Sequence, residues 1–220
     1  MKIKKLFFAL IFLLAFVLWT FFVINLDVKP IGPNNSCVGL STLNGFIYKT
    51  FGVNFLLYNI TDWLGLVPIL FALGFAVLGF VQWIKRKNIL KVDYDILILG
   101  VFYLITFALY ILFEIYVINY RPVLINSYLE ASYPSSTTIL VLCIMPTAII
   151  QFNHRIKNKI ANKICVLSVV LFTAFMVIGR LLSGVHWFSD IIGGIFISSS
   201  LVFMYDFVFN AIKKPNPTKC

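Results

Sequence analysis

A histidine and an aspartate four residues apart, His186 and Asp190, are the pair in this sequence best suited to chemistry. At the start of a helix such residues share one face, so the carboxylate could hold the imidazole in one tautomer and stabilise its charged form. Arg180 lies six residues earlier, and its planar guanidinium group matches phosphate oxygens. The ordinary interpretation is that Asp190 begins a helix, His186 lies at an interface and Arg180 reaches toward water. The surroundings of the three residues must decide between the catalytic and the ordinary interpretation.

Two more polar clusters precede this one in the sequence. Arg121 is followed by a proline, and Glu114 lies seven residues before it. Ser135, Ser136 and Thr137 follow another proline, directly before an apolar block. Each cluster has a simple explanation, since serine and threonine commonly cap helices and an arginine before a proline is common at a helix end. Exposed backbone N–H groups and hydroxyls at a helix start can also bind an anion, so the three clusters together indicate a phosphate site.

The composition is that of a membrane protein. Of 220 residues, 61% are hydrophobic and only 12% are charged. The net charge of +10 could suggest nucleic-acid binding. However, the basic residues form short clusters between apolar blocks rather than one basic face, so we expect a lipid bilayer and no nucleic acid as the partner.

The elements that must position these clusters are apolar runs of about 20 residues, the length that crosses a bilayer. They predict an all-α integral membrane protein, a single domain over residues 1–220 with six transmembrane helices. A semi-apolar stretch at 43–57 is expected to lie along the interface as a short helix in the first outer loop. The predicted spans are residues 6–26, 63–84, 96–118, 135–152, 164–182 and 190–210.

The basic residues predict how the chain is oriented. With the N-terminus inside, fourteen of the eighteen lysines and arginines fall in cytoplasmic segments, as the positive-inside rule requires. Both termini are therefore expected to be cytoplasmic. Arg121 and Arg180 are among the four exceptions, so all three polar clusters are expected at the outer ends of the helices. Charged groups at membrane depth are costly, and their presence there favours a function.

The sequence gives no sign of a metal or cofactor site. The four cysteines show neither a C-x-x-C pair nor metal-ligand spacing, and no cluster of metal ligands is visible elsewhere. We therefore expect neither a metal nor another cofactor, and no disulfide framework.

The three clusters in this order resemble the type 2 phosphatidic acid phosphatase superfamily. The chain contains R-P at Arg121, P-S-x-x at Ser135 and R-x-x-x-x-x-H-x-x-x-D from Arg180 to Asp190. The resemblance implies that His186 is a nucleophile that forms a phosphohistidine and that Asp190 orients it. It also implies that Arg121, Arg180, Ser135 and the backbone at Ser136 hold the phosphate oxygens. Phosphoryl transfer depends mainly on positioning and charge stabilisation, so such a site needs no metal.

The sequence departs from the family pattern at four positions. Glu114 replaces a lysine, Ser136 a glycine, Thr137 a histidine and Gly179 a serine. The resemblance implies that the missing histidine is the general acid that protonates the leaving group, a role worth roughly 10² to 10⁴ in rate. The other histidine of the chain, His154, is expected in a cytoplasmic loop and cannot replace it.

Two explanations would keep the protein catalytic. A diphosphate substrate releases a phosphate monoester with a second pKa of about 6, whereas an alkoxide has a conjugate acid near ~15.7. A lipid diphosphate such as a polyprenyl diphosphate would therefore suffer least from the missing acid. Alternatively, Glu114, buried near the phosphate with a raised pKa, serves as the replacement acid. The ordinary interpretation of Glu114 is a salt bridge to Arg121 or Arg180, which would leave it no acid role. Thr137 is expected to be an accessory residue.

The leading hypothesis is a plasma-membrane lipid phosphatase, with a membrane lipid as substrate and its active site facing outside. A phosphotransferase would use the same residues, with a hydroxyl acceptor in place of water. A catalytically silent relative that binds lipid phosphates would explain Glu114 and Thr137. A small transporter or channel subunit is a further alternative, in which the glycine pairs 193–194 and 74 with 79 would be helix-packing positions.

Overall fold

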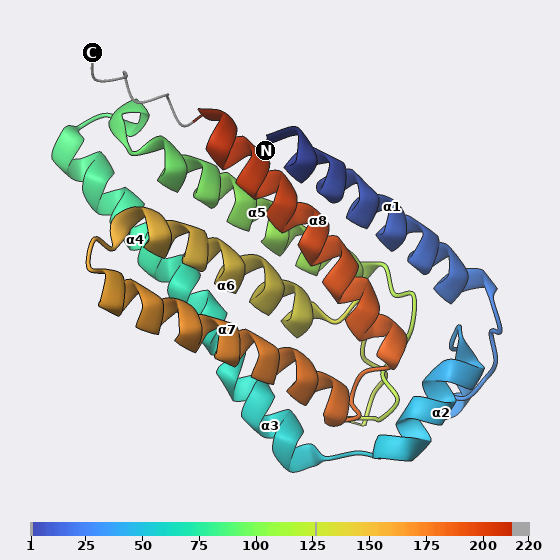
Figure 1. Ribbon diagram of the computed structural model, residues 1–220. Coiled ribbons are helices and arrows are strands. Elements are labelled where there is room, and N and C mark those ends of the chain that lie inside the picture. The colour runs from blue at the N-terminus through green and yellow to red at the C-terminus, as the bar shows by residue number, and fades with distance from the viewer. Residues whose placement is uncertain (1, 126, 213–220) are drawn as a thin grey trace.

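The computed structural model describes residues 2–125 and 127–212 of the chain, and these are largely helical (Figure 1). Six helical segments among them are long and apolar enough to cross a membrane. This confirms the predicted all-α bundle. The tail at 213–220, with three of the basic residues counted above, lies outside the described residues. The spanning segments are α1 (Lys2–Asn25), α3 with α4 (Phe55–Leu64 and Leu66–Arg86), α5 (Tyr94–Ile115), α6 (Ser136–Arg155), α7 (Lys159–Leu182) and α8 (Phe188–Ile212).

The first connection differs from the expected single helix at 43–57. It forms α2 (Ser41–Phe51), which lies beyond the end of the bundle, and α3, which continues through Gly65 into α4 (Figure 1). Gly52 ends α2 with a φ of 65°, a conformation that glycine adopts without strain. Asn54 then caps α3, since its side chain accepts a hydrogen bond from the N–H of Leu57 at 2.9 Å. The expected helix is therefore broken in the middle.

Several helices also extend beyond the apolar runs that predicted them. The helix α7 begins at Lys159 rather than at residue 164, because the side chain of Asn158 accepts from the N–H groups of Ile160 and Ala161 and so caps it there. By contrast, α5 is shorter at its C-terminus than predicted, since it ends at Ile115 rather than at residue 118. Apolar runs mark the hydrocarbon core, whereas helix ends are set by capping in the interface.

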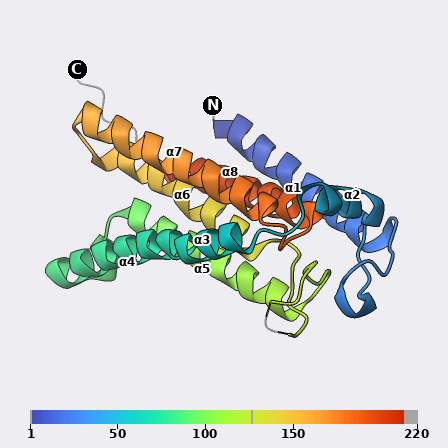
Figure 2. The same cartoon turned by 90° about the horizontal axis from the view of Figure 1, so that it is seen from below.

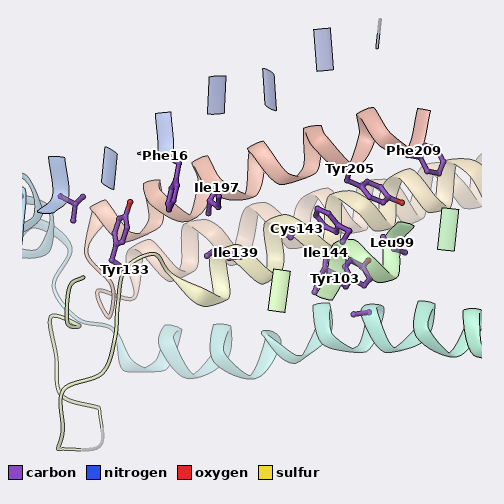
Figure 3. Packing of buried hydrophobic residues seen from close by; sticks show 13 residues of the cluster. Phe16, Leu99, Tyr103, Tyr133, Ile139, Cys143, Ile144, Ile197, Tyr205 and Phe209 are labelled. Carbon is purple, nitrogen blue, oxygen red and sulfur yellow. The ribbon is translucent and has the colours of Figure 1, made fainter. Parts of the chain in front are cut away.

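The helix α6 occupies the middle of the bundle, among α4, α5, α7 and α8, while α1 packs along α8 (Figures 1 and 2). Its residues Ile139, Cys143 and Ile144 are fully buried and contribute to the main hydrophobic cluster (Figure 3). Because lipid tails are as apolar as these side chains, such helices associate through close packing. A central α6 fixes the position of its own first turn, which contains Ser136 and Thr137 of the second polar cluster.

Ion pairs hold together the end of the bundle that carries Arg86 and Arg155, which we call the basic end. Arg155 lies 2.6 Å from Asp95, and Arg86 lies 2.8 Å from Asp93. At the same end Gln151 donates to the hydroxyl of Tyr205 at 2.9 Å. The opposite end, where α6 and α8 begin and α7 terminates, is called the site end.

A loop at 116–135 closes the site end, and hydrogen bonds hold it in place. The N–H of Ser132 donates to the carbonyl of Asn119 at 2.9 Å, and the N–H of Arg121 donates to the carbonyl of Glu130 at 3.0 Å. The indole N–H of Trp187, at the start of α8, donates to the carbonyl of Tyr120 at 2.7 Å. The loop thus doubles back on itself and brings residues 121 and 132 against the start of α8.

Two glycines of α8 permit this close approach. A Cβ at Gly193 would lie 2.7 Å from the ring of Tyr133, and a Cβ at Gly194 would lie 3.0 Å from the methyl of Thr138. Gly193 and Gly194 are therefore packing positions for the loop and α6. By contrast, Gly74 faces open space, so it is not a helix-packing position.

Candidate active site

His186 lies in the short turn between α7 and α8, and its ring is buried. The turn contains Gly184 with a φ of 67°, and a Cβ there would collide with the backbone of Gly52. On one side, Nε2 of His186 lies 3.2 Å from Nη2 of Arg180. On the other, Nδ1 lies 3.0 Å from the hydroxyl oxygen of Ser132. Each ring nitrogen thus has its own partner.

The sequence predicted that the carboxylate of Asp190 holds the imidazole of His186. In the structure the two groups form no direct hydrogen bond. Oδ2 of Asp190 lies 3.9 Å from Nδ1 of His186, which is beyond hydrogen-bonding distance. The hydroxyl of Ser132 lies between the two groups and donates to the same Oδ2 at 2.5 Å. The carboxylate therefore contacts the imidazole through a serine that sequence reasoning missed. No spacing rule distinguishes Ser132 from the neighbouring serines, because its position depends on the folding of the loop.

The carboxylate of Asp190 is fully buried and accepts several hydrogen bonds. The backbone N–H of Trp187 donates to Oδ2 at 2.9 Å, and the hydroxyl of Ser189 donates to Oδ1 at 3.2 Å. The backbone carbonyl of Asp190 accepts a hydrogen bond from the N–H of Ser135 at 3.0 Å. Asp190 thus links the start of α8 to the start of α6.

Arg180 lies in the last turn of α7 and is only 1% exposed. Its Nη1 is 3.5 Å from Asp62, and its guanidinium group stacks on the ring of Tyr58 at 5.1 Å. Its buried Nε has no hydrogen-bond partner within the described part of the chain. The guanidinium group is held by α3 on one side and faces His186 on the other.

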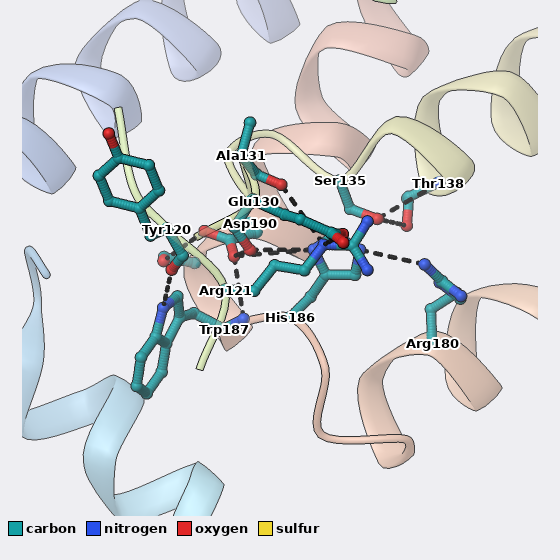
Figure 4. Close-up of polar contacts among 12 residues, drawn as sticks. Tyr120, Arg121, Glu130, Ala131, Ser135, Thr138, Arg180, His186, Trp187 and Asp190 are labelled. Atoms are coloured by element: carbon teal, nitrogen blue, oxygen red, sulfur yellow. Dashed lines mark hydrogen bonds and ion pairs between the residues drawn. The ribbon is translucent and has the colours of Figure 1, made fainter. Parts of the chain in front are cut away.

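Arg121 reaches the same place from the loop (Figure 4). Its Nε lies 3.3 Å from the carboxylate of Glu130 and 3.4 Å from the carbonyl of Ala131. Its Nη1 is buried, and no described residue accepts a hydrogen bond from it. Figure 4 shows the guanidinium groups of Arg121 and Arg180 turned toward the ring of His186. The structure thus brings together the arginines of two separate sequence clusters.

The second cluster lies at the start of α6. Ser135 is the N-cap, and its hydroxyl oxygen accepts from the hydroxyl of Thr138 at 3.0 Å and from its N–H at 3.5 Å. Its own hydroxyl proton therefore stays available for another acceptor. Ser136 lines a small cavity together with Glu114 and Ser132. Thr137 lies close to Gly65, at the junction of α3 and α4.

Glu114 does not form the salt bridge that the sequence suggested as one alternative. The carboxylates that pair with Arg121 and Arg180 are those of Glu130 and Asp62. Glu114 instead lies in the last turn of α5, where it lines the small cavity beside Ser132 and Ser136. Glu130, which no motif distinguished, is the acidic residue in contact with Arg121.

The surroundings of His186 favour a neutral imidazole. Burial, together with the nearby charges of Arg121 and Arg180, holds the pKa of His186 well below its usual range. A neutral ring keeps a lone pair on one nitrogen near neutral pH. Within residues 2–125 and 127–212, no three His, Cys, Asp or Glu side chains lie close enough to hold a metal ion. The groups that meet here are a neutral imidazole, a carboxylate and two guanidinium groups.

Comparisons with known proteins concern the fold and the family of the chain. A search of solved structures finds the crystal structure of the first transmembrane PAP2 type phosphatidylglycerolphosphate phosphatase from Bacillus subtilis. The two share 18% sequence identity over 94% of this chain and 98% of that chain, with a TM-score of 0.66. At this identity the likeness concerns the fold. No curated protein sequence matches the chain. The family model of the PAP2 superfamily matches residues 95–213, more than half of the sequence, and the chain therefore belongs to the PAP2 superfamily.

Proposed function

We propose that the protein is a membrane lipid phosphatase that removes phosphate from a lipid phosphate or diphosphate through a phosphohistidine at His186. One observation carries the proposal. Nη1 of Arg121 and Nε of Arg180 are buried beside the imidazole without a partner in the described residues. Buried donors left unpaired are costly, and charged ones especially so. A phosphate group bound between them would accept hydrogen bonds from both.

The first chemical step uses Nε2 of His186 as the nucleophile. Its lone pair attacks phosphorus, an N–P bond forms, and the bond from phosphorus to the leaving oxygen breaks with its electron pair. Negative charge on the phosphoryl oxygens is stabilised by Arg121 and Arg180, while Ser135 supplies a hydroxyl. In the second step water attacks phosphorus, and the N–P bond breaks to release phosphate and restore the imidazole.

The leaving group argues for a diphosphate substrate. Thr137 occupies the family's histidine position, and its hydroxyl is too weak an acid to protonate a leaving group near neutral pH. A phosphate-monoester leaving group, with its second pKa of about 6, needs little protonation, whereas an alkoxide needs it strongly. We therefore favour a polyprenyl diphosphate over a lipid phosphomonoester. Glu114, beside Ser132 and Ser136, is the residue placed to serve as an acid if one is used.

The location of the site suits a substrate anchored in a membrane. His186 lies at the end of the bundle opposite Arg86 and Arg155. By the positive-inside rule we therefore expect it to face the outside, as proposed for a plasma-membrane enzyme. The apolar tail of the substrate would stay in the bilayer while its head group reaches the two arginines at the site end. The protein would then act on lipids of the outer leaflet.

The test is phosphate release from a panel of lipids by wild-type protein and the His186→Ala variant in detergent or lipid vesicles. The panel contains a polyprenyl diphosphate, a polyprenyl monophosphate and phosphatidic acid. His154→Ala is the matched control, because His154 is exposed at the basic end, 3.3 Å from Asp95. The proposal predicts release by wild type and by the control, fastest from the diphosphate, and none by His186→Ala.

Other results would lead to other functions. If wild type and His186→Ala were equally inactive on every lipid, the protein would be a silent relative that binds lipid phosphates. If phosphate appeared on an added lipid alcohol rather than in solution, it would be a phosphotransferase. Faster release from phosphatidic acid than from polyprenyl diphosphate would contradict the substrate preference.

A further inference from the structure

The hydroxyl of Ser132 lies between the two groups that the motif would pair directly. It is 3.0 Å from Nδ1 of His186 and 2.5 Å from Oδ2 of Asp190, whereas those two atoms are 3.9 Å apart. All three side chains are buried. The arrangement is therefore a three-membered chain of imidazole, hydroxyl and carboxylate.

The hydrogen bonds around Asp190 determine where the proton of Ser132 lies. The carboxylate already accepts from the N–H of Trp187 at 2.9 Å. It also accepts from Ser189, whose oxygen in turn accepts from the side-chain amide of Asn44 at 2.9 Å. A carboxylate in this role accepts only, so the single proton of Ser132 points toward Asp190. The oxygen of Ser132 then presents a lone pair to His186.

The proton of His186 follows from this assignment. A lone pair on Ser132 requires that Nδ1 carry the proton, which leaves the lone pair of the ring on Nε2. On that side Arg180 donates to Nε2, with the nitrogens 3.2 Å apart. The opposite tautomer would place an N–H of the ring against an N–H of the guanidinium group, which has no acceptor. Both neighbours of the ring thus select the same tautomer.

We infer that Ser132 is a positioning residue that locks His186 in the Nδ1–H tautomer and so presents the Nε2 lone pair to phosphorus. The inference rests on the proposed function for its consequence in catalysis. When Nε2 attacks, the electron pair of the broken P–O bond leaves with oxygen, and the proton stays on Nδ1. The positive charge that develops on the ring is stabilised by Asp190 through the hydroxyl of Ser132.

The backbone holds Ser132 in this place from both sides. Its own N–H donates to Asn119, and the next residue, Tyr133, packs its ring against Gly193. The hydroxyl of Tyr133 is 2.7 Å from that of Thr20 on α1. The serine therefore cannot follow the imidazole if the ring turns, which is what a positioning group requires.

The first test reads the tautomer itself by ¹⁵N NMR of histidine-labelled protein near neutral pH. The chain has two histidines, so a His154→Gln background leaves His186 alone. We expect Nδ1 protonated and Nε2 unprotonated in Ser132-containing protein. Because Arg180 selects the same tautomer, the effect of Ser132 is read in an Arg180→Ala background, where we expect a single tautomer with Ser132 present and a mixture of tautomers in Arg180→Ala/Ser132→Ala. Protonated Nε2 with Ser132 present, or the same spectrum for Arg180→Ala with and without Ser132, would overturn the inference. This readout needs no substrate, so its failure is separate from failure of the proposed phosphatase activity.

The second test is kinetic and distinguishes positioning from simple packing. Loss of a hydrogen bond to a charged group predicts that Ser132→Ala lowers kcat roughly 10- to 100-fold, with KM nearly unchanged. Ser132→Thr retains the hydroxyl and should restore most of the rate. The control is Ser200→Ala, which loses a buried hydroxyl bonded to the carbonyl of Ala9 at 2.9 Å, away from the site. Equal effects of Ser132→Ala and Ser200→Ala on kcat would show that Ser132 only packs.

Discussion

Nη2 of Arg180 lies 3.2 Å from Nε2 of His186, across the turn that joins α7 to α8. The contact joins a permanent positive charge to the ring nitrogen that would attack phosphorus. The two residues come close because the five residues between them turn back from α7 to α8. The predictions below follow from this relationship and from the groups around it.

Replacing either arginine by lysine should impair activity although the charge remains. A lysine ammonium cannot donate two parallel hydrogen bonds to a phosphate as a guanidinium group does. We expect Arg121→Lys and Arg180→Lys each to lower kcat/KM by roughly 10² to 10³, the usual cost of losing one preorganised donor. Initial rates of phosphate release measure this. Arg86→Lys at the basic end is the control, and an equal loss there would point to general damage.

The activity should persist into acid solution. In the proposed mechanism the neutral imidazole is the nucleophile, and protonation would occupy its lone pair. Because burial and the two arginines lower the pKa of His186, the neutral form survives below the ordinary value near 6.5. The pH at which kcat/KM declines on the acid side, here called the acid limb, should therefore lie well below 6.5. A limb at or above pH 6.5 would contradict this account of the site.

Removal of one nearby charge should shift that limb in a known direction. Arg121 disfavours the protonated ring, so Arg121→Gln should raise the pKa of His186 and move the acid limb toward higher pH. The position of the limb is compared with wild type, independently of the lower overall rate. An unchanged position would mean that Arg121 does not act on the imidazole.

A methyl group at Gly193 should disturb the site from a distance. Its Cβ would lie 2.7 Å from the ring of Tyr133, and the displaced loop would move Ser132 away from Asp190. Overpacking of this kind costs about 1–3 kcal/mol of unfolding free energy. We expect Gly193→Ala to lower both thermal stability and kcat. Gly74→Ala is the matched control, since a Cβ there meets open space, and it should leave both unchanged.

Glu114→Gln separates two explanations for the missing general acid. If the diphosphate leaving group needs no acid, the variant should hydrolyse a polyprenyl diphosphate within a few-fold of the wild-type rate. The rate from a lipid phosphomonoester is measured in parallel. A fall of roughly 10² or more on the diphosphate would instead make Glu114 the acid.

The spans and one of the site's contacts, that of Arg180 with His186, could be predicted from local sequence. Uncharged runs of membrane length identify the helices, because the bilayer imposes one length on all of them. Arg180 and His186 end one helix and precede the next, so a short turn must bring them close. The meeting of Arg121 with them followed from the motif resemblance rather than from spacing.

Ser132 and Glu130 could not be predicted, because they belong to an irregular loop whose shape depends on distant contacts. Trp187 bonds to the loop through Tyr120, and Gly193 admits Tyr133. Nothing in the local sequence encodes these pairings. For the same reason the hydroxyl of Ser132 between Asp190 and His186 could not be predicted.

The most direct test of the account is to trap the phosphorylated enzyme. Wild-type protein is mixed with lipid diphosphate labelled with ³²P at its terminal phosphate and quenched within milliseconds in alkali, in which phosphohistidine survives. We predict label on the peptide containing His186, lost on acid treatment and absent from His186→Ala. Rapid phosphate release by wild type without labelled His186, or equal release by His186→Ala, would contradict the claim that this histidine is the nucleophile.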